Sequence, residues 1–132
     1  MKKSSTKKKE YQITSSINDG FLEITITGTA AGQDFEKMVH ELEEILKANG
    51  AKKAIFDVRG LTGRIENMEI YRFVRNRPSV IYDIQSAILD SLENAHQETA
   101  AKNAGISLWK WFTELDAART WLKASKKFIS SF

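Results

Sequence analysis

Three short apolar segments, each followed by a helical pattern, constrain the fold of this chain more than any other feature. They are "KKAIFDV" (52–58), "IQSAILD" (84–90) and "ISLWKWF" (106–112). Their apolar residues favour short strands within the sheet, and the first segment is a near-continuous run, which is typical of a strand buried on both faces. Strands that alternate with helices over such short connections predict a mainly parallel sheet covered by helices.

The segments that precede them predict a β-hairpin and a helix. "EYQITSSI" (10–17) and "FLEITITG" (21–28) are rich in strand-forming residues, and the Asn-Asp-Gly between them is a strong hairpin signal. From Asp34 to Asn49 the apolar residues recur with helical spacing, and Gly50 predicts the end of this helix. The first strand should therefore be an antiparallel edge of the sheet.

Three more helices are predicted, over residues 68–76, about 90–104 and 113–122. The first ends before Pro78. In the second, Glu93 is spaced to reach back to a capping Asp or Ser, as in a capping box. The element order is β-β-α-β-α-β-α-β-α, which defines an α/β fold.

Length and charge indicate one domain, over residues 10–125, between a basic tail (1–9) and a C-terminal tail (126–132). Five of the twenty Lys and Arg lie in the first nine residues, so fifteen remain against seventeen Asp and Glu. The net charge of +3 therefore describes the tail and not the body. We expect this tail to be disordered and to contact nucleic acid at most weakly and in a salt-dependent way.

Composition argues against several classes of protein. The chain has no cysteine, which excludes thiol nucleophiles and thiolate metal sites, and no apolar stretch approaches the roughly 20 residues of a membrane span. His40 lies on the polar side of the first helix, and His96 lacks ligands at metal-binding spacing on its own helix, so both are interpreted as surface residues. We therefore expect a cytoplasmic protein with no transmembrane segment, no metal, no cofactor and no catalytic constellation.

The segment "FDVRGLTGR" (56–64) is the candidate site, because it follows a buried strand at the edge where open α/β sheets place their sites. It lacks the Lys-Ser/Thr pair of a nucleotide-binding loop. Its arginines, and those of the next helix, either form a solvated surface or bind an anion or a partner. The candidate residues are Asp57, Arg59, Gly60, Thr62, Gly63, Arg64, Tyr71, Arg72 and Arg75.

Two further features leave alternatives open. Trp109 and Trp111 share one face of their strand, which favours core packing or, alternatively, an exposed aromatic contact patch. The helix over 90–104 is poor in apolar residues, with mainly Leu92, Ala95 and Ala100 to pack. It therefore packs loosely or completes a weak homodimer.

Three segments together resemble the STAS and anti-sigma-factor-antagonist (SpoIIAA-like) superfamily, and more narrowly its small stand-alone bacterial members. They are "GFLEITITGTAAGQDFEKMVHELEEILKANG" (20–50), "KKAIFDVRGLTGRIENMEIYRF" (52–73) and "WFTELDAARTWL" (111–122). The resemblance implies four β-α turns behind an antiparallel first strand, a fold shared with lipid-carrying CRAL-TRIO domains. It also implies a regulatory, protein-binding role and no catalysis.

In that family the turn after the third strand carries an Asp-Ser-Ser-Gly-like motif whose serine is phosphorylated. Here Thr62 is the only hydroxyl between Asp57 and Arg64, and it is the candidate phosphorylation site. The resemblance thus implies an interaction module whose contact surface centres on this loop. The alternative is a carrier or sensor of a small amphipathic or lipid-like ligand whose anionic head binds the arginines.

Overall fold

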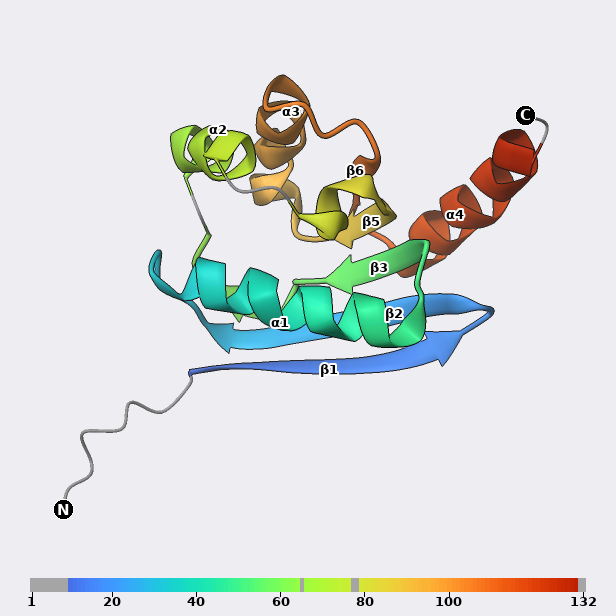
Figure 1. Cartoon of the computed structure of the whole chain (residues 1–132), viewed down its shortest axis with the longest axis horizontal. Helices are drawn as coiled ribbons and strands as arrows, with labels where there is room; N and C mark the ends of the chain where they lie inside the picture. Colours follow the sequence, from blue (N-terminus) through green and yellow to red (C-terminus); the bar gives the residue numbers. More distant parts are fainter. Residues whose placement is uncertain (1–9, 65, 77–78, 131–132) are drawn as a thin grey trace, which may run out of the picture.

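The computed structural model describes residues 10–64, 66–76 and 79–130 (Figure 1). The predicted basic tail and Pro78 lie outside these ranges. The strands are β1 (Tyr11–Asn18), β2 (Phe21–Thr29), β3 (Lys53–Asp57), β4 (Leu61–Thr62), β5 (Gln85–Leu89) and β6 (Trp109–Phe112). The helices are α1 (Asp34–Asn49), α2 (Asn67–Asn76), α3 (His96–Asn103) and α4 (Leu115–Ser130), with the 3-10 turns η1 (Val80–Asp83) and η2 (Leu92–Asn94).

The sheet has the predicted mixed topology. Its strand order is β1-β2-β3-β5-β6, with the short β4 added beside β2. β1 pairs antiparallel with β2 at the edge, whereas every other pairing is parallel. Asp19 and Gly20 both have positive φ, at 56° and 82°, as the tight hairpin turn between β1 and β2 requires. The α/β class and the antiparallel edge strand are therefore confirmed.

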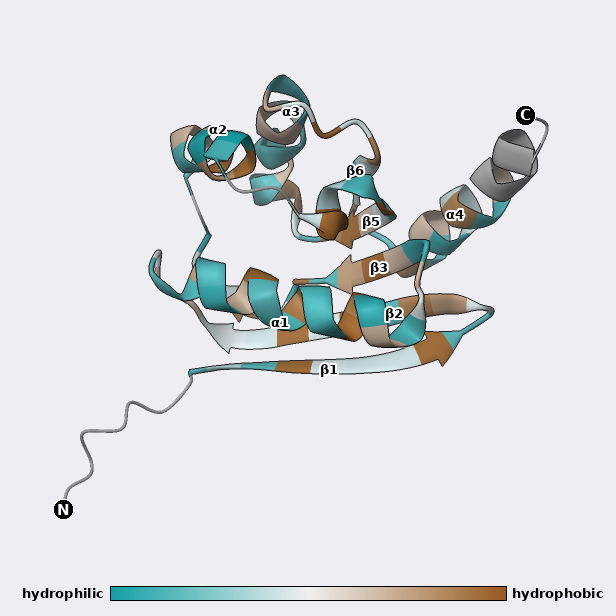
Figure 2. Cartoon of the chain, in the orientation of Figure 1, coloured by the Kyte–Doolittle hydropathy of each residue, from teal (hydrophilic) through white to brown (hydrophobic). Residues whose placement is uncertain are grey.

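Side chains alternate across the sheet and form one core on each face. On one face, Phe56 of β3 and Ile88 of β5 belong to a core that includes the buried side of α1. On the other face, their neighbours Ile55 and Leu89 pack with Ala118 and Leu122 of α4. Figure 2 shows the apolar colour concentrated on the central strands and striped along α1.

The helices divide unequally between these faces. α1 packs on the first face, and α3 lies against β6 there, with α2 beside α3 (Figure 1). α4 lies alone on the second face, against β3, β5 and β6. Trp109 and Trp111 pack against the first core, so core packing is the correct one of the two interpretations. No helix in the described ranges is long and apolar enough to cross a membrane.

The prediction of one continuous helix over residues 90–104 is wrong. The chain forms the 3-10 turn η2, and α3 begins only at His96. The side chain of Ser91 makes no capping hydrogen bond, and Leu92, expected to pack, is 77% exposed. Gln97 and Ala101 are instead the buried residues of this helix.

Two strand predictions and one helix end also require correction. The strand predicted over 106–112 begins only at Trp109, because Ile106 N donates to Ala101 O (2.9 Å) and closes α3 in a helix-ending motif. The glycine-rich loop contains β4, which was not predicted. α4 continues past residue 122 to Ser130, so residues 126–130, predicted as a tail, are helical.

Gly63 offers a test of how tightly this loop is fixed to β2. Its φ is 99°, and an added Cβ would lie 2.1 Å from the carbonyl oxygen of Ala30, a backbone atom. Gly20 also has a positive φ, but nothing lies within 4 Å of its Cβ position. We expect Gly20→Ala to lower the free energy of unfolding by about 1 to 2 kcal/mol, and Gly63→Ala to lower it by roughly 2 kcal/mol more.

Urea denaturation of the two variants measures this difference. Gly20→Ala controls for a positive φ, so the excess loss in Gly63→Ala reports mainly the clash with the carbonyl oxygen of Ala30. Equal losses would show that the loop moves away from Ala30 at little cost.

Candidate functional site

Two aspartates mark the carboxyl ends of neighbouring parallel strands, and each binds an arginine of the candidate loop. Asp57 ends β3, and Asp90 directly follows β5. Arg59 binds the first and Arg64 binds the second. The site predicted at this edge of the sheet is thus built from two arginine-carboxylate pairs.

Arg64 is the more deeply placed of the two arginines. Its Nη2 and Nε donate to the two carboxylate oxygens of Asp90 at 2.8 and 3.3 Å, and its other N–H groups donate to backbone carbonyls. These carbonyls belong to Leu61 (2.6 Å), Gly63 (2.8 Å) and Val58 (2.9 Å). All five guanidinium donors are therefore used, and three of them bind backbone carbonyls of the same loop.

Asp90 is the anchor for this arrangement. Its side chain is 1% exposed, and its Oδ1 also accepts from Ser91 N (2.7 Å) and Asn94 Nδ2 (3.2 Å). The carboxylate thus holds both the loop after β3 and the first residues after β5. After Asp90 the chain turns through η2, and α3 begins only at His96.

The second pair is more exposed. Arg59 Nε and Nη2 donate to the carboxylate of Asp57 at 3.0 and 2.9 Å, and Arg59 N donates to it at 3.1 Å. Burial is the largest single influence and would raise the pKa of Asp57, but the hydrogen bonds and charge of Arg59 outweigh it and lower the pKa below 3.8. The pKa of Arg59 is raised, first by its hydrogen bond to Asp57 and also by the charge of Glu114.

The two pairs lie on opposite faces of the sheet. Asp90 lies two residues after Ile88, so its side chain is on the same face of the sheet, where it lines the first core with Arg64. Asp57 lies two residues after Ile55, so its side chain is on the other face, which α4 covers. The loop therefore crosses the edge of the sheet, with one arginine fixed on each side.

Backbone hydrogen bonds fix the rest of the loop to β2. Gly28 N donates to Gly60 O (3.1 Å), and Ala30 N donates to Thr62 O (2.9 Å). Gly60 and Thr62 are exposed, although their backbone is held in this ladder. The glycines thus serve close backbone approach, at Gly63 above all, as well as the turn that the sequence indicated.

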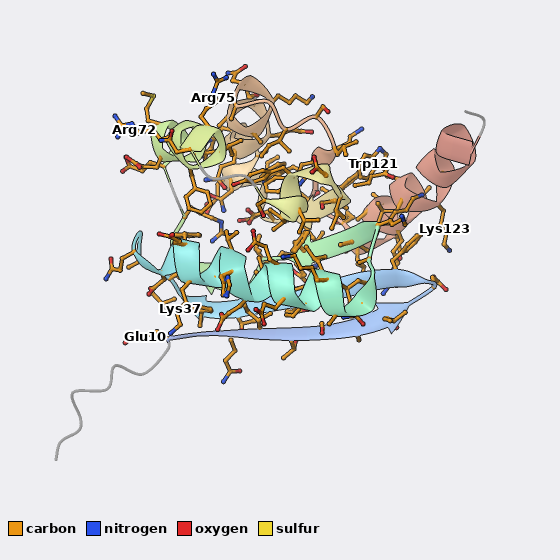
Figure 3. All side chains as sticks on the ribbon, in the orientation of Figure 1. Glu10, Lys37, Arg72, Arg75, Trp121 and Lys123 are labelled. Atoms are coloured by element: carbon orange, nitrogen blue, oxygen red, sulfur yellow. The ribbon has the colours of Figure 1, made fainter. Side chains whose placement is uncertain are left out.

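The arginines of α2 do not join this site. Arg72 and Arg75 lie on the outer side of α2 and point away from the sheet (Figure 3). Arg72 forms an exposed ion pair with Glu69 at 2.9 Å. The side chain of Tyr71 lies outside the described part of the structure. Six of the nine predicted residues thus lie in the fixed loop, and Arg72 and Arg75 lie on the outer side of α2.

An apolar cavity of about 170 Å³ lies between the first face of the sheet and α1, α2 and α3. Phe35 of α1, Phe73 of α2 and Ala101 of α3 line it, and Arg64 and Asp90 form part of its wall. Trp109 and Trp111 line it from the sheet. Sequence reasoning singled out these tryptophans and considered a carrier of a small amphipathic ligand, but it missed Asp90 as a site residue.

The two histidines lie on the surface, as expected. His40 is 65% exposed beside Glu43 and Glu44, and His96 is exposed at the start of α3. Among residues 10–64, 66–76 and 79–130, no group of three or more acidic or histidine side chains could hold a metal ion.

Two crystal structures share this architecture. An anti-sigma factor antagonist from Mycobacterium paratuberculosis matches with a TM-score of 0.59 and 10% identity, over 86% of this chain and 94% of that chain. An uncharacterized DUF3478-family protein with a SpoIIAA-like fold, from Shewanella loihica PV-4, matches with a TM-score of 0.54 and 19% identity, over 89% of this chain and 97% of that one. No protein-family model and no curated protein sequence matches.

The similarity defines an α/β protein with an antiparallel edge strand and a parallel sheet between α1 and α4. More particularly, the chain has the SpoIIAA-like fold. The fold implied by the sequence resemblance is therefore confirmed.

The two arginine-carboxylate pairs should differ sharply in their contribution to stability. Arg64→Met leaves Asp90 buried without its counter-charge and removes one donor from each of three loop carbonyls, so we expect the free energy of unfolding to fall by about 3 to 5 kcal/mol. Arg59→Met is the matched control, because this side chain is 48% exposed and its pair is partly solvated. We expect a loss of at most about 1 kcal/mol there. Urea denaturation measures both, and equal losses would contradict the anchoring role of Arg64.

The lowered pKa of Asp57 predicts a pH dependence. The pKa is about 3.8 in the unfolded chain and lower in the folded protein, so the stabilisation is complete above 3.8 and is lost as the pH falls through the folded-state value. We expect the stability advantage of the wild type over Asp57→Asn to be constant near neutral pH and to shrink in acid. Asp83→Asn, which changes an exposed carboxylate in η1, is the control. A stability advantage of the wild type that stays unchanged in acid, well below pH 3.8, would show that the carboxylate charge of Asp57 does not contribute to stability.

Proposed function

We propose that this chain is a non-catalytic regulatory module of STAS type that binds a protein partner at the carboxyl ends of β3 and β4. One structure with the same fold is that of an anti-sigma factor antagonist, a name that describes a regulatory protein acting against another protein. The fold supports the class of function, and the geometry of the loop supports the location of the contact surface.

The observation that carries this location is the complete use of the Arg64 donors within the loop. With Arg64 turned inward, the exposed residues of the loop are held on a fixed backbone. We call Arg59, Gly60 and Thr62, all of which are exposed, the loop surface. A preorganised surface loses less conformational entropy on binding than a mobile one, and arginine is enriched in protein interfaces.

The chemical groups at this edge are already bound to one another, which supports binding and not catalysis. Arg64 and Asp90 form a closed hydrogen-bonded unit, and Asp57 is held as a carboxylate by Arg59. A general acid or base requires a carboxyl group whose pKa is moved toward neutrality, whereas that of Asp57 is moved away from it.

Thr62 gives this surface a means of control. It is exposed on β4, two residues from Gly60 and three from Arg59. A phosphate on Thr62 would place negative charge on the loop surface and change its complementarity to a partner. Because the Thr62 backbone is paired with β2, we expect this change to act through charge and shape and not through unfolding of the loop.

Charge substitutions on the loop surface test the proposal. We expect Arg59→Glu and Thr62→Glu to lose the same partner proteins when the purified protein is used to capture proteins from a lysate of its own host. Lys52→Glu is the matched control, since Lys52 is exposed just before β3, at the opposite end of that strand. Quantitative mass spectrometry measures the capture, and thermal denaturation verifies folding. Retention of every specific partner by both loop variants would refute the proposal.

A further inference from the structure

The outer edge of β1, from Ile13 to Ile17, has no partner strand in the described part of the chain. β1 is the first strand in the order β1-β2-β3-β5-β6, and it pairs with β2 over all eight of its residues without a bulge. In Figure 1 it forms the border of the sheet, and no described helix or strand lies beyond it. An edge of this kind presents backbone donors and acceptors that can pair with another strand.

The backbone N–H and C=O groups of Ile13, Ser15 and Ile17 point away from β2. Thr29 N donates to Glu10 O at 2.9 Å, so these two residues form a hydrogen-bonded pair of the antiparallel ladder. Such pairs recur at every second residue, and the even-numbered residues of β1 therefore direct their backbone groups toward β2. The odd-numbered residues between them direct theirs outward, where a second strand could bind them.

β1 lacks the features by which natural edge strands prevent such pairing. Its sequence, YQITSSIN, contains no Lys, Arg, Asp, Glu or Pro. Charged side chains, proline and bulges are the usual obstacles on an edge strand. The charged residues next to it in the chain are Glu10 and Asp19, and Asp19 is paired with Lys123 at 3.4 Å. A second strand can therefore approach β1 without meeting a charge within the strand.

The side chains of β1 are complementary to those of a second copy of β1. In an antiparallel pair centred on Ser15, the two Ser15 residues face each other, and Ile13 of each copy faces Ile17 of the other. All three outward-facing residues are then hydrogen-bonded to the other copy. On the opposite face of the sheet, Thr14 faces Ser16, so that apolar residues meet apolar ones and polar residues meet polar ones.

Ile17 supplies the apolar surface that this pairing would bury. Its side chain is 62% exposed, whereas Ile13 is half-buried against the first core. The two residues lie on the same face of the sheet, because they are four positions apart on one strand. In the paired copies, Ile17 of each chain covers Ile13 of the other, which continues the first core across the contact. A second copy thus accounts for an apolar side chain that is otherwise left in solvent.

We propose that two copies of this chain associate by antiparallel pairing of β1 with β1, centred on Ser15, into one continuous sheet. Each copy contributes a single strand, which is less than a standard protein interface, so the dimer is weak and forms at high protein concentration. The pairing edge shares no residue with the loop surface. Failure of this proposal would leave the partner proposal standing, and the reverse also holds.

Two substitutions of the same kind test this contact. Ile17→Lys places a charge on the pairing edge, and Leu92→Lys is the matched control, because Leu92 is 77% exposed on η2, in the segment for which the sequence suggested a dimer. Sedimentation equilibrium up to about 1 mM protein gives the dimer Kd. We expect Ile17→Lys to weaken the wild-type dimer about tenfold or more, and Leu92→Lys to leave it unchanged.

Three results of this experiment would overturn the proposal. They are a wild type that stays monomeric at the highest concentration, an Ile17→Lys variant that dimerises as strongly as the wild type, and a Leu92→Lys variant that is weakened as much as Ile17→Lys. Thermal denaturation verifies that both variants fold.

Single-cysteine variants test the register independently of these substitutions. The chain has no cysteine of its own, so each variant carries one thiol. In the pairing centred on Ser15, the two Ser15 Cβ atoms lie about 5.5 Å apart, within reach of a short bifunctional thiol reagent. We expect Ser15→Cys to give a covalent dimer and Thr27→Cys, exposed on β2, to give little at the same protein concentration. Equal cross-linking of the two variants would overturn the proposal, even if Ile17→Lys does not fold.

Discussion

The hydrogen-bonded pair of Arg64 and Asp90 is the interaction on which the architecture of this edge depends. It joins residues that are 26 positions apart and ties the loop after β3 to the end of β5, and Arg64 also donates to three carbonyls of this loop. A buried ion pair is not in itself strong evidence for stability, because both charges lose their hydration. Here the hydrogen bonds to the backbone satisfy the remaining donors, so the pair determines conformation as well as charge balance.

This interaction also explains which parts of the structure could be predicted. The bounds of α1 follow from local signals, namely the helical period and Gly50, and they are confirmed at both ends. The hairpin is equally local, since Asp19 and Gly20 specify its turn. By contrast, the binding of Asp90 by Arg64 depends on tertiary contact. Asp90, which the sequence indicated as a possible helix cap, binds Arg64 in the structure. The helix α3 begins only at His96.

In the candidate site, too, some features follow from the order of elements along the sequence and others depend on tertiary contacts. The order of strands predicted that the candidate loop lies at the edge where the carboxyl ends of parallel strands meet, and the structure places the loop there. Spacing could not show that Arg59 and Arg64 lie on opposite faces of the sheet. The short strand β4 was not predicted, and through it the backbone of Gly60 and Thr62 joins the β2 ladder. A strand of two residues has no periodicity by which it could be recognised.

The cavity and the loop surface meet at the loop of Arg64, but a ligand in the cavity need not affect the loop surface. Coupling between two sites needs a ligand that favours one of two loop arrangements over the other. A neutral molecule in the cavity leaves the five donors of Arg64 in place, and so it gives no reason for Arg59 or Thr62 to move. A ligand that displaced Arg64 would release Val58 O, Leu61 O and Gly63 O together, and only such a ligand would transmit its binding to the loop surface. The charge of a cavity ligand would thus decide whether the cavity and the loop surface act independently or as one linked unit.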